Sequence, residues 1–148
     1  MIHGDKATMA SYALELDQAK AYYDPEREVV YVAYEGILGA DAPAEVYNWL
    51  EALYDDIDVK TMYAQIFDFR KVTAFDDSNL KTARRTSSRM NMSVDISHVP
   101  VALIVSDPYH QEILLGSMRI SPHHIRKKIV WSEDEAYQFF EQWHANRE

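Results

Sequence analysis

The run VALIV at residues 101–105 restricts the fold of this chain more than any other feature. Its five residues are all apolar, with no polar residue alternating between them. A strand of this kind is covered on both faces, which is typical of parallel sheets with helices packed against them. Asp107 and Pro108 come directly afterwards and predict the start of a helix, because aspartate caps helices and proline is tolerated in the first turn.

The rest of the chain repeats this order of strand and helix. An antiparallel hairpin is predicted first, from strands at 12–23 and 28–35, with a turn at 24–27 and an end at Gly36. Asp41 should then cap a helix. The elements predicted after it are a strand at 63–69, a helix at 78–92, the strand at 101–105, a helix from 107 and a strand at 128–131.

A final helix is predicted after Ser132. Serine followed three residues later by Glu135 is the pattern of a capping box, in which each side chain bonds a backbone N–H of the first turn. Ala136, Phe139, Phe140 and Trp143 recur at helical spacing, so we expect them to be buried. The sequence therefore predicts one α/β domain over 1–148, with an N-terminal β-hairpin, alternating α and β elements, and a mixed central sheet with flanking helices. Residues 1–10 are a candidate for a disordered N-terminal tail.

Composition excludes several classes of function. The formal net charge is −9, which disfavours binding to nucleic acid or an anionic membrane, since both are polyanions. The chain has no cysteine, so disulfides, thiol nucleophiles and thiolate metal sites are ruled out. Its longest apolar stretch, at 99–105, is far shorter than the about 20 residues of a spanning helix. The first residues do not read as a signal peptide, so a cytoplasmic setting is expected.

Motifs that would predict an enzyme are also missing. The four glycines form neither a phosphate loop nor a dinucleotide fingerprint, and no nucleophile elbow is present. His123 and His124, with His110 nearby in sequence, invite a metal interpretation, but adjacent side chains diverge and a solvated loop fits better. We therefore expect no enzyme activity, no cofactor and no metal site. Ten tyrosines, several of them between 12 and 34, favour sheet packing over a ligand cleft.

Polar residues gather where two predicted strands end. Asp76, Asp77, Ser78 and Asn79 follow one strand, and Ser106 and Asp107 follow another. Ligands and partners tend to meet the carboxyl ends of strands in open α/β sheets. A helix needs only one cap, so the surplus at 76–79 leaves two interpretations open: capping alone, or capping and recognition. In the helix that follows, Lys81 and Arg85 share a face that is either ordinary solvated surface or a docking site for an acidic partner or a phosphate.

The stretch DFRKVTAFDDSNL at 68–80 resembles the signature of STAS domains, the anti-sigma-factor antagonist (SpoIIAA-like) family. The resemblance implies a STAS-like fold in a stand-alone bacterial regulatory protein that binds another protein. Asp77 takes the place of the serine that the family phosphorylates, and Asn79 takes the place of its glycine. Ser78, one residue along, is then the candidate phosphorylation site.

From this resemblance we expect a non-catalytic domain that meets its partner at the corner between strand and helix. The partner-binding residues would be Asp76, Asp77, Ser78, Asn79, Lys81 and Arg85, and the domain could form a homodimer. The alternative function is a carrier or sensor of a small apolar ligand, which would require an apolar cavity of roughly several hundred Å³.

Overall fold

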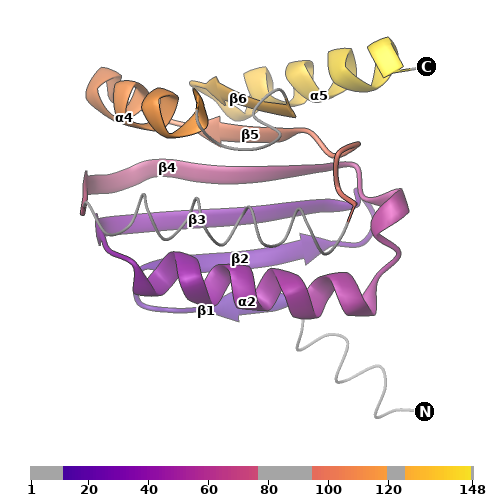
Figure 1. The fold of residues 1–148 in the computed structure, drawn as a ribbon, viewed down its shortest axis with the longest axis horizontal. Coiled ribbons are helices and arrows are strands. Elements are labelled where there is room, and N and C mark those ends of the chain that lie inside the picture. The colour runs from indigo at the N-terminus through magenta and orange to yellow at the C-terminus, as the bar shows by residue number, and fades with distance from the viewer. Residues whose placement is uncertain (1–11, 77–94, 120–125, 148) are drawn as a thin grey trace.

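The computed structural model describes residues 12–76, 95–119 and 126–147. These residues form one six-stranded sheet whose strands lie in sequence order, together with three α-helices and a short 3-10 helix (Figure 1). The strands are β1 (Ala13–Glu15), β2 (Ala19–Asp24), β3 (Val29–Leu38), β4 (Ala64–Phe75), β5 (Val101–Ile104) and β6 (Lys127–Val130). The helices are α2 (Asp41–Asp56), η1 (Val59–Thr61), α4 (Pro108–Arg119) and α5 (Glu133–Arg147). None of the described helices combines the length and apolar character that crossing a membrane would require.

The sheet is mixed, as the sequence predicted. β1, β2 and β3 pair antiparallel, and β3 to β6 pair parallel. β5 lies between β4 and β6, and all four of its residues are buried. The prediction that residues 101–105 form an interior strand is therefore confirmed.

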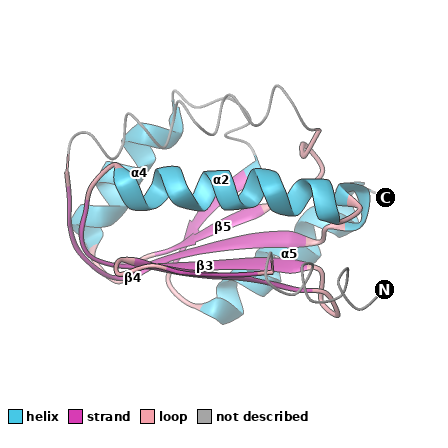
Figure 2. Ribbon diagram, turned by 90° about the horizontal axis from the view of Figure 1, so that it is seen from below, coloured by secondary structure: helices cyan, strands magenta, loops and turns pink. Residues whose placement is uncertain are grey.

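The sequential strand order decides where the helices lie. Connections between parallel neighbours in a sheet are almost always right-handed, so successive crossovers in one direction fall on the same face. α2 joins β3 to β4 and α4 joins β5 to β6, and both lie on one face of the sheet (Figure 2). α5 follows the last strand and packs on the opposite face.

Each face of the sheet has its own apolar core. Under α2 and α4 the buried side chains include Val30, Val32, Leu50, Leu53 and Leu114. The core under α5 is smaller and joins Ala136 and Phe140 to Ile66 and Ile104. Lys20 and Tyr22 of β2 also point to the α5 side, but both are exposed. α5 therefore covers only part of its face.

The strands at the start of the chain differ from the prediction in their bounds. The predicted strand at 12–23 is two strands, β1 and β2, because the chain turns between Glu15 and Ala19 and pairs with itself. β3 does not end at Gly36. This glycine has a φ of 79°, which L side chains rarely adopt, and it sits among register shifts where the strand is bulged but continues to Leu38.

β4 is also longer than the predicted strand at 63–69. It continues to Phe75 because the extended end of β3 supplies hydrogen-bonding partners as far as Leu38, which pairs with Phe75. The far ends of β3 and β4 curl toward the face that carries α2 and α4 (Figure 2). The curl agrees with the two register shifts, since bulges increase the twist of a strand.

Three predicted helix starts in the described residues are confirmed, but the predicted cap is right at two of them and wrong at one. The backbone N–H of Tyr109 donates to Asp107 Oδ1 at 2.7 Å, so Asp107 caps α4 as predicted. Ser132 Oγ accepts from the N–H of Glu135 at 3.1 Å, and Glu135 Oε1 accepts from the N–H of Trp131 at 2.8 Å, which completes a variant of the capping box. Asp41 is not the cap of α2. The cap position is Ala40, which makes no side-chain bond, and Asp41 lies in the first turn, where its charge suits the helix dipole.

The predicted apolar stripe of α5 is narrower than expected. Ala136 and Phe140 are fully buried, but Phe139 and Trp143 are only partly buried at its margin. Trp143 Nε1 instead donates to the carbonyl of His98 at 2.9 Å, and a ring nitrogen of His144 lies 2.8 Å from the carbonyl of Tyr63. These contacts hold the C-terminal half of α5 to the segments that precede β5 and β4.

Phe140→Ala should therefore be the most damaging truncation on α5. Removing a fully buried phenylalanine from a packed core costs about 3–5 kcal/mol of unfolding free energy. Phe139→Ala is the matched control and should cost clearly less, because water already reaches that ring. Urea unfolding followed by circular dichroism measures both values, and equal losses would contradict the assignment of Phe140 as the anchor.

Candidate functional site

The predicted recognition corner begins where β4 ends. Asp76 follows Phe75, is exposed, and its backbone N–H donates to the carbonyl of Leu38 at 3.0 Å. The curled end of the β3–β4 pair thus holds its backbone. The other predicted residues, Asp77, Ser78, Asn79, Lys81 and Arg85, lie outside the described residues. Their roles, including capping and phosphorylation at Ser78, stay predictions.

Two exposed apolar side chains lie at the same end of the domain as Asp76. Ile37 on β3 is 65% exposed, and its backbone pairs with Ala74, two residues before Asp76. Tyr109 in the first turn of α4 is 70% exposed. The next residue, His110, is buried and packs edge-on against Phe75 with ring centroids 5.1 Å apart. The curl of β4 therefore brings Tyr109 and Asp76 to the same end of the domain. Sequence reasoning missed Ile37 and Tyr109, because it placed the end of this strand at residue 69.

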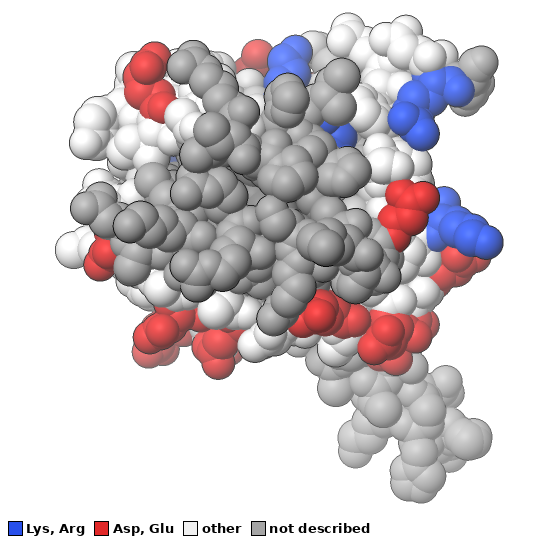
Figure 3. All heavy atoms as spheres, in the orientation of Figure 1, with Lys and Arg blue, Asp and Glu red and all other residues white. Residues whose placement is uncertain are grey.

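This end of the domain is acidic. Asp41 at the start of α2, Asp76 and the capping Asp107 all lie at the carboxyl ends of the strands β3, β4 and β5. α2 as a whole carries five acids and no lysine or arginine: Asp41, Glu45, Glu51, Asp55 and Asp56. Acidic side chains line the α2 edge of the molecule in Figure 3.

A hydrogen-bonded cluster occupies the opposite face of β4. Asp68 is only 8% exposed and holds Arg70 in a fork, with Nε to Oδ1 at 3.0 Å and Nη2 to Oδ2 at 2.7 Å. The backbone N–H of Arg70 also donates to Oδ1 at 3.0 Å, and the Tyr31 hydroxyl donates to Oδ2 at 2.5 Å. Asp68 and Arg70 are two apart on a strand and so share a face. That spacing was the one available signal for the pair in the sequence.

The cluster fixes the charge states of its members. Burial alone would raise the pKa of Asp68, but the hydrogen bonds from Arg70 and Tyr31 outweigh burial and lower it. Burial, followed by the hydrogen bond to Asp68, raises the pKa of the Tyr31 hydroxyl far above its usual value. The hydrogen bond to Asp68 likewise raises the pKa of Arg70. Ser106 Oγ donates to the Arg70 carbonyl at 3.3 Å. This bond joins β4 to the end of β5, where Ser106 and Asp107 follow the strand.

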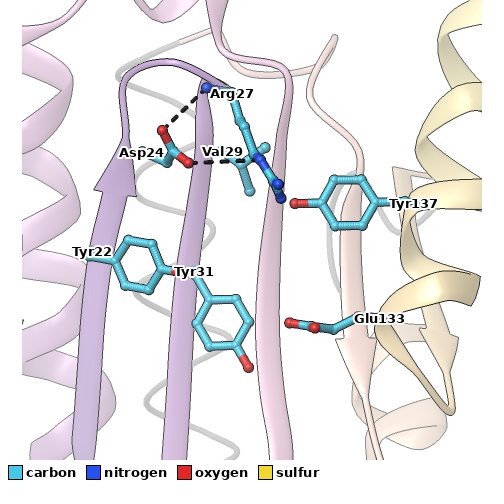
Figure 4. A pocket seen from close by; sticks show the side chains of 7 residues that line it. All are labelled: Tyr22, Asp24, Arg27, Val29, Tyr31, Glu133 and Tyr137. Atoms are coloured by element: carbon cyan, nitrogen blue, oxygen red, sulfur yellow. Dashed lines mark hydrogen bonds and ion pairs between the residues drawn. The ribbon is translucent and has the colours of Figure 1, made fainter.

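Some of the tyrosines between 12 and 34 pack in the core, and others line a pocket. Tyr23 and Tyr34 are buried in the α2-side core, as the packing interpretation predicted. Tyr22 is 50% exposed and stacks on Tyr31, with centroids 5.6 Å apart and ring planes 23° from parallel. These two rings border a pocket of about 80 Å³ whose other lining residues are Asp24, Arg27, Val29, Glu133 and Tyr137 (Figure 4). This volume is far below the roughly 300–1,000 Å³ of ligand pockets, so the pocket does not support the carrier alternative.

No group of three or more metal-ligating side chains occurs within the part of the chain that the structure describes. His110, one of the three histidines considered in the sequence, is buried beside Phe75. His123 and His124 fall outside the described ranges.

Asp68→Asn should destabilise the fold in a pH-dependent way. A carboxylate with a lowered folded-state pKa stabilises the protein above its unfolded pKa and loses that contribution as pH falls through the folded value. We expect a cost of about 1–3 kcal/mol at pH 7. The difference from wild type should shrink below pH 3.8, the ordinary value for this carboxyl.

Urea unfolding at pH 7 and at several values down to about pH 2 tests this expectation. Asp17→Asn is the matched control, because Asp17 is exposed in the turn between β1 and β2 and should change stability by less than about 0.5 kcal/mol at either pH. A cost for Asp68→Asn that stays constant over this range would show that the Asp68 charge contributes nothing.

Comparison with known proteins adds no family assignment. No family model matches the chain, and no curated protein matches it.

Proposed function

We propose that this chain is a non-catalytic regulatory domain of the STAS-like kind, which acts in the cytoplasm by binding another protein. Contact would be made at the corner that Asp76 begins, with Asp77, Ser78, Asn79, Lys81 and Arg85 contributing from the segment that follows. The observation that supports this proposal best is the exposure of Ile37 and Tyr109 at the same end of the domain as Asp76. We refer below to Ile37, Asp76, Tyr109 and residues 77–79 as the corner.

The physical argument rests on the cost of exposing apolar surface. Burying a large apolar side chain that was exposed to water stabilises a protein or a complex by about 1.5–3 kcal/mol. Single exposed apolar residues are common on monomers and need no explanation, but Ile37 and Tyr109 come from different elements and lie at the same end of the sheet. Aromatic residues are enriched in the energetic centres of protein interfaces. Asp76 and Asp107 would then belong to the polar rim around them.

Tyr109→Ser should separate binding from folding. Because the ring is 70% exposed, the melting temperature should barely change, whereas affinity for a purified partner should fall by at least about tenfold if the ring is an anchor. The partner is first recovered by affinity pull-down and mass spectrometry, and its dissociation constant is then measured by isothermal titration calorimetry. Lys20→Ser is the control, since it changes an exposed side chain on the opposite face of the sheet and should leave this affinity unchanged.

The residues implied by the resemblance need a separate test. Asp77→Ala and Ser78→Ala should each weaken the same complex while leaving thermal stability nearly intact, unless the altered residue is the helix cap, whose loss costs about 0.5–2 kcal/mol. Phosphorylation of Ser78 would add negative charge next to Asp77 and should change the affinity for the partner. Affinity that is indifferent to Tyr109→Ser, Asp77→Ala and Ser78→Ala alike would rule out the corner as the contact surface.

A further inference from the structure

The pocket beside Tyr22 and Tyr31 is separate from the corner and has a chemistry of its own. It opens on the face of the sheet opposite α2, between the β2–β3 hairpin and the first two turns of α5. Its floor is Val29, and its walls are three tyrosines, two carboxylates and one guanidinium (Figure 4). A concave site with converging aromatic and charged groups is suited to bind one small polar head group.

The guanidinium in the wall already has partners. Arg27 Nε lies 4.0 Å from Asp24 Oδ2, and the Arg27 side chain is also hydrogen-bonded to Tyr137. Asp24 in turn accepts from the backbone N–H of Glu26 at 2.9 Å, so the turn holds this carboxylate in place. Arg27 and Asp24 thus place opposite charges in the same wall of the pocket, and the Arg27 side chain stays 69% exposed.

The carboxylate of Glu133 is the third charged group of the pocket, and the pair of Arg27 and Asp24 does not include it. Its carboxylate points from the start of α5 toward the ring of Tyr31 (Figure 4). No ion pair or side-chain hydrogen bond joins it to another residue of the described ranges. Glu133 also lies close enough to disfavour ionisation of both Tyr22 and Tyr31. The pocket thus holds an unmatched negative charge next to the rings of two stacked tyrosines.

We propose that this pocket binds a guanidinium group, through charge pairing with Glu133 and contact with the tyrosine rings. Aromatic faces and carboxylates both attract organic cations. Guanidinium fits better than ammonium, because it is planar, more weakly hydrated, stacks on aromatic rings and matches a carboxylate with two donors. The volume of about 80 Å³ accommodates a head group of this size but not a larger ligand.

Titration by NMR tests the proposal with defined probes. N-acetyl-arginine amide is added to ¹⁵N-labelled protein, and the amide shifts of β2, β3 and the start of α5 are followed. The neutral isostere N-acetyl-citrulline amide and the cation N-acetyl-lysine amide are added in parallel. We expect saturable shifts around Tyr22, Tyr31 and Glu133 with the arginine probe, weaker binding of the lysine probe, and no saturable shifts with citrulline.

Two variants locate the site. Glu133→Gln and Tyr22→Val should each weaken the arginine probe by about threefold to fivefold, the range expected of partly exposed charge pairs and cation–π contacts. Glu45→Gln is the matched control. It removes an exposed glutamate from α2 on the opposite face and should leave the affinity unchanged. Melting temperatures of all three variants show whether the fold is kept.

The outcomes are distinct. Equal shifts with the arginine and citrulline probes, or an affinity unaffected by both Glu133→Gln and Tyr22→Val, would overturn the proposal. Equal binding of lysine and arginine would overturn the preference for guanidinium. A pentapeptide with a central arginine that binds more tightly than the capped amino acid would identify a protein side chain as the source, and weaker binding would identify a free guanidino compound. None of these results bears on the corner, whose test uses Tyr109, Asp77 and Ser78.

Discussion

The hand of the crossover connections is the constraint on which the rest of this structure depends. Because β3 to β6 follow one another as parallel neighbours, connections of the usual right hand put α2 and α4 on one face of the sheet. The opposite face can be covered only by an element outside those connections. α5 is that element, and one helix of 15 residues cannot cover six strands. The open part of this face, where the guanidinium pocket lies, is therefore a result of topology.

The side chains of β4 on the α5 side show where the part of the sheet covered by α5 ends. Ile66 points to the α5 side and is packed against apolar neighbours, as is Ile104 on the next strand. Two residues further on, Asp68 takes the same face, and its charge is matched by Arg70 and Tyr31 rather than by a helix. This polar cluster lies at the end of the apolar core. Arg70 suits the position because its side chain is 39% exposed and keeps part of its hydration. Glu133 and Tyr137 of α5 then form the far wall of the pocket.

The sequence predicted those parts of the fold that short-range chemistry determines. The apolar run at 101–105, the cap at Asp107 and the box of Ser132 and Glu135 all have local signals, and each was confirmed. It failed where one strand depends on another: Gly36 stops an isolated strand, yet a bulge carries β3 past it, and the longer β3 in turn lengthens β4. For the same reason the sequence could not place Ile37 and Tyr109 at the same end of the domain as Asp76, nor bring Glu133 to Tyr31 across some hundred residues. The roles of Ser78, Lys81 and Arg85 stay predictions.

The position of α5 after the last strand also has a consequence for synthesis on the ribosome. Domains tend to fold as units while the chain emerges. Here the described strands, α2 and α4 are all translated before α5, so one face of β5 and β4, with Ala102, Ile104 and Ile66, lacks the cover that α5 provides until α5 is made. A nascent chain would expose this apolar strip for the whole of that interval. Chaperone binding to stalled chains that end before residue 133, and its loss once Phe140 has left the exit tunnel, would mark the moment at which the fold closes.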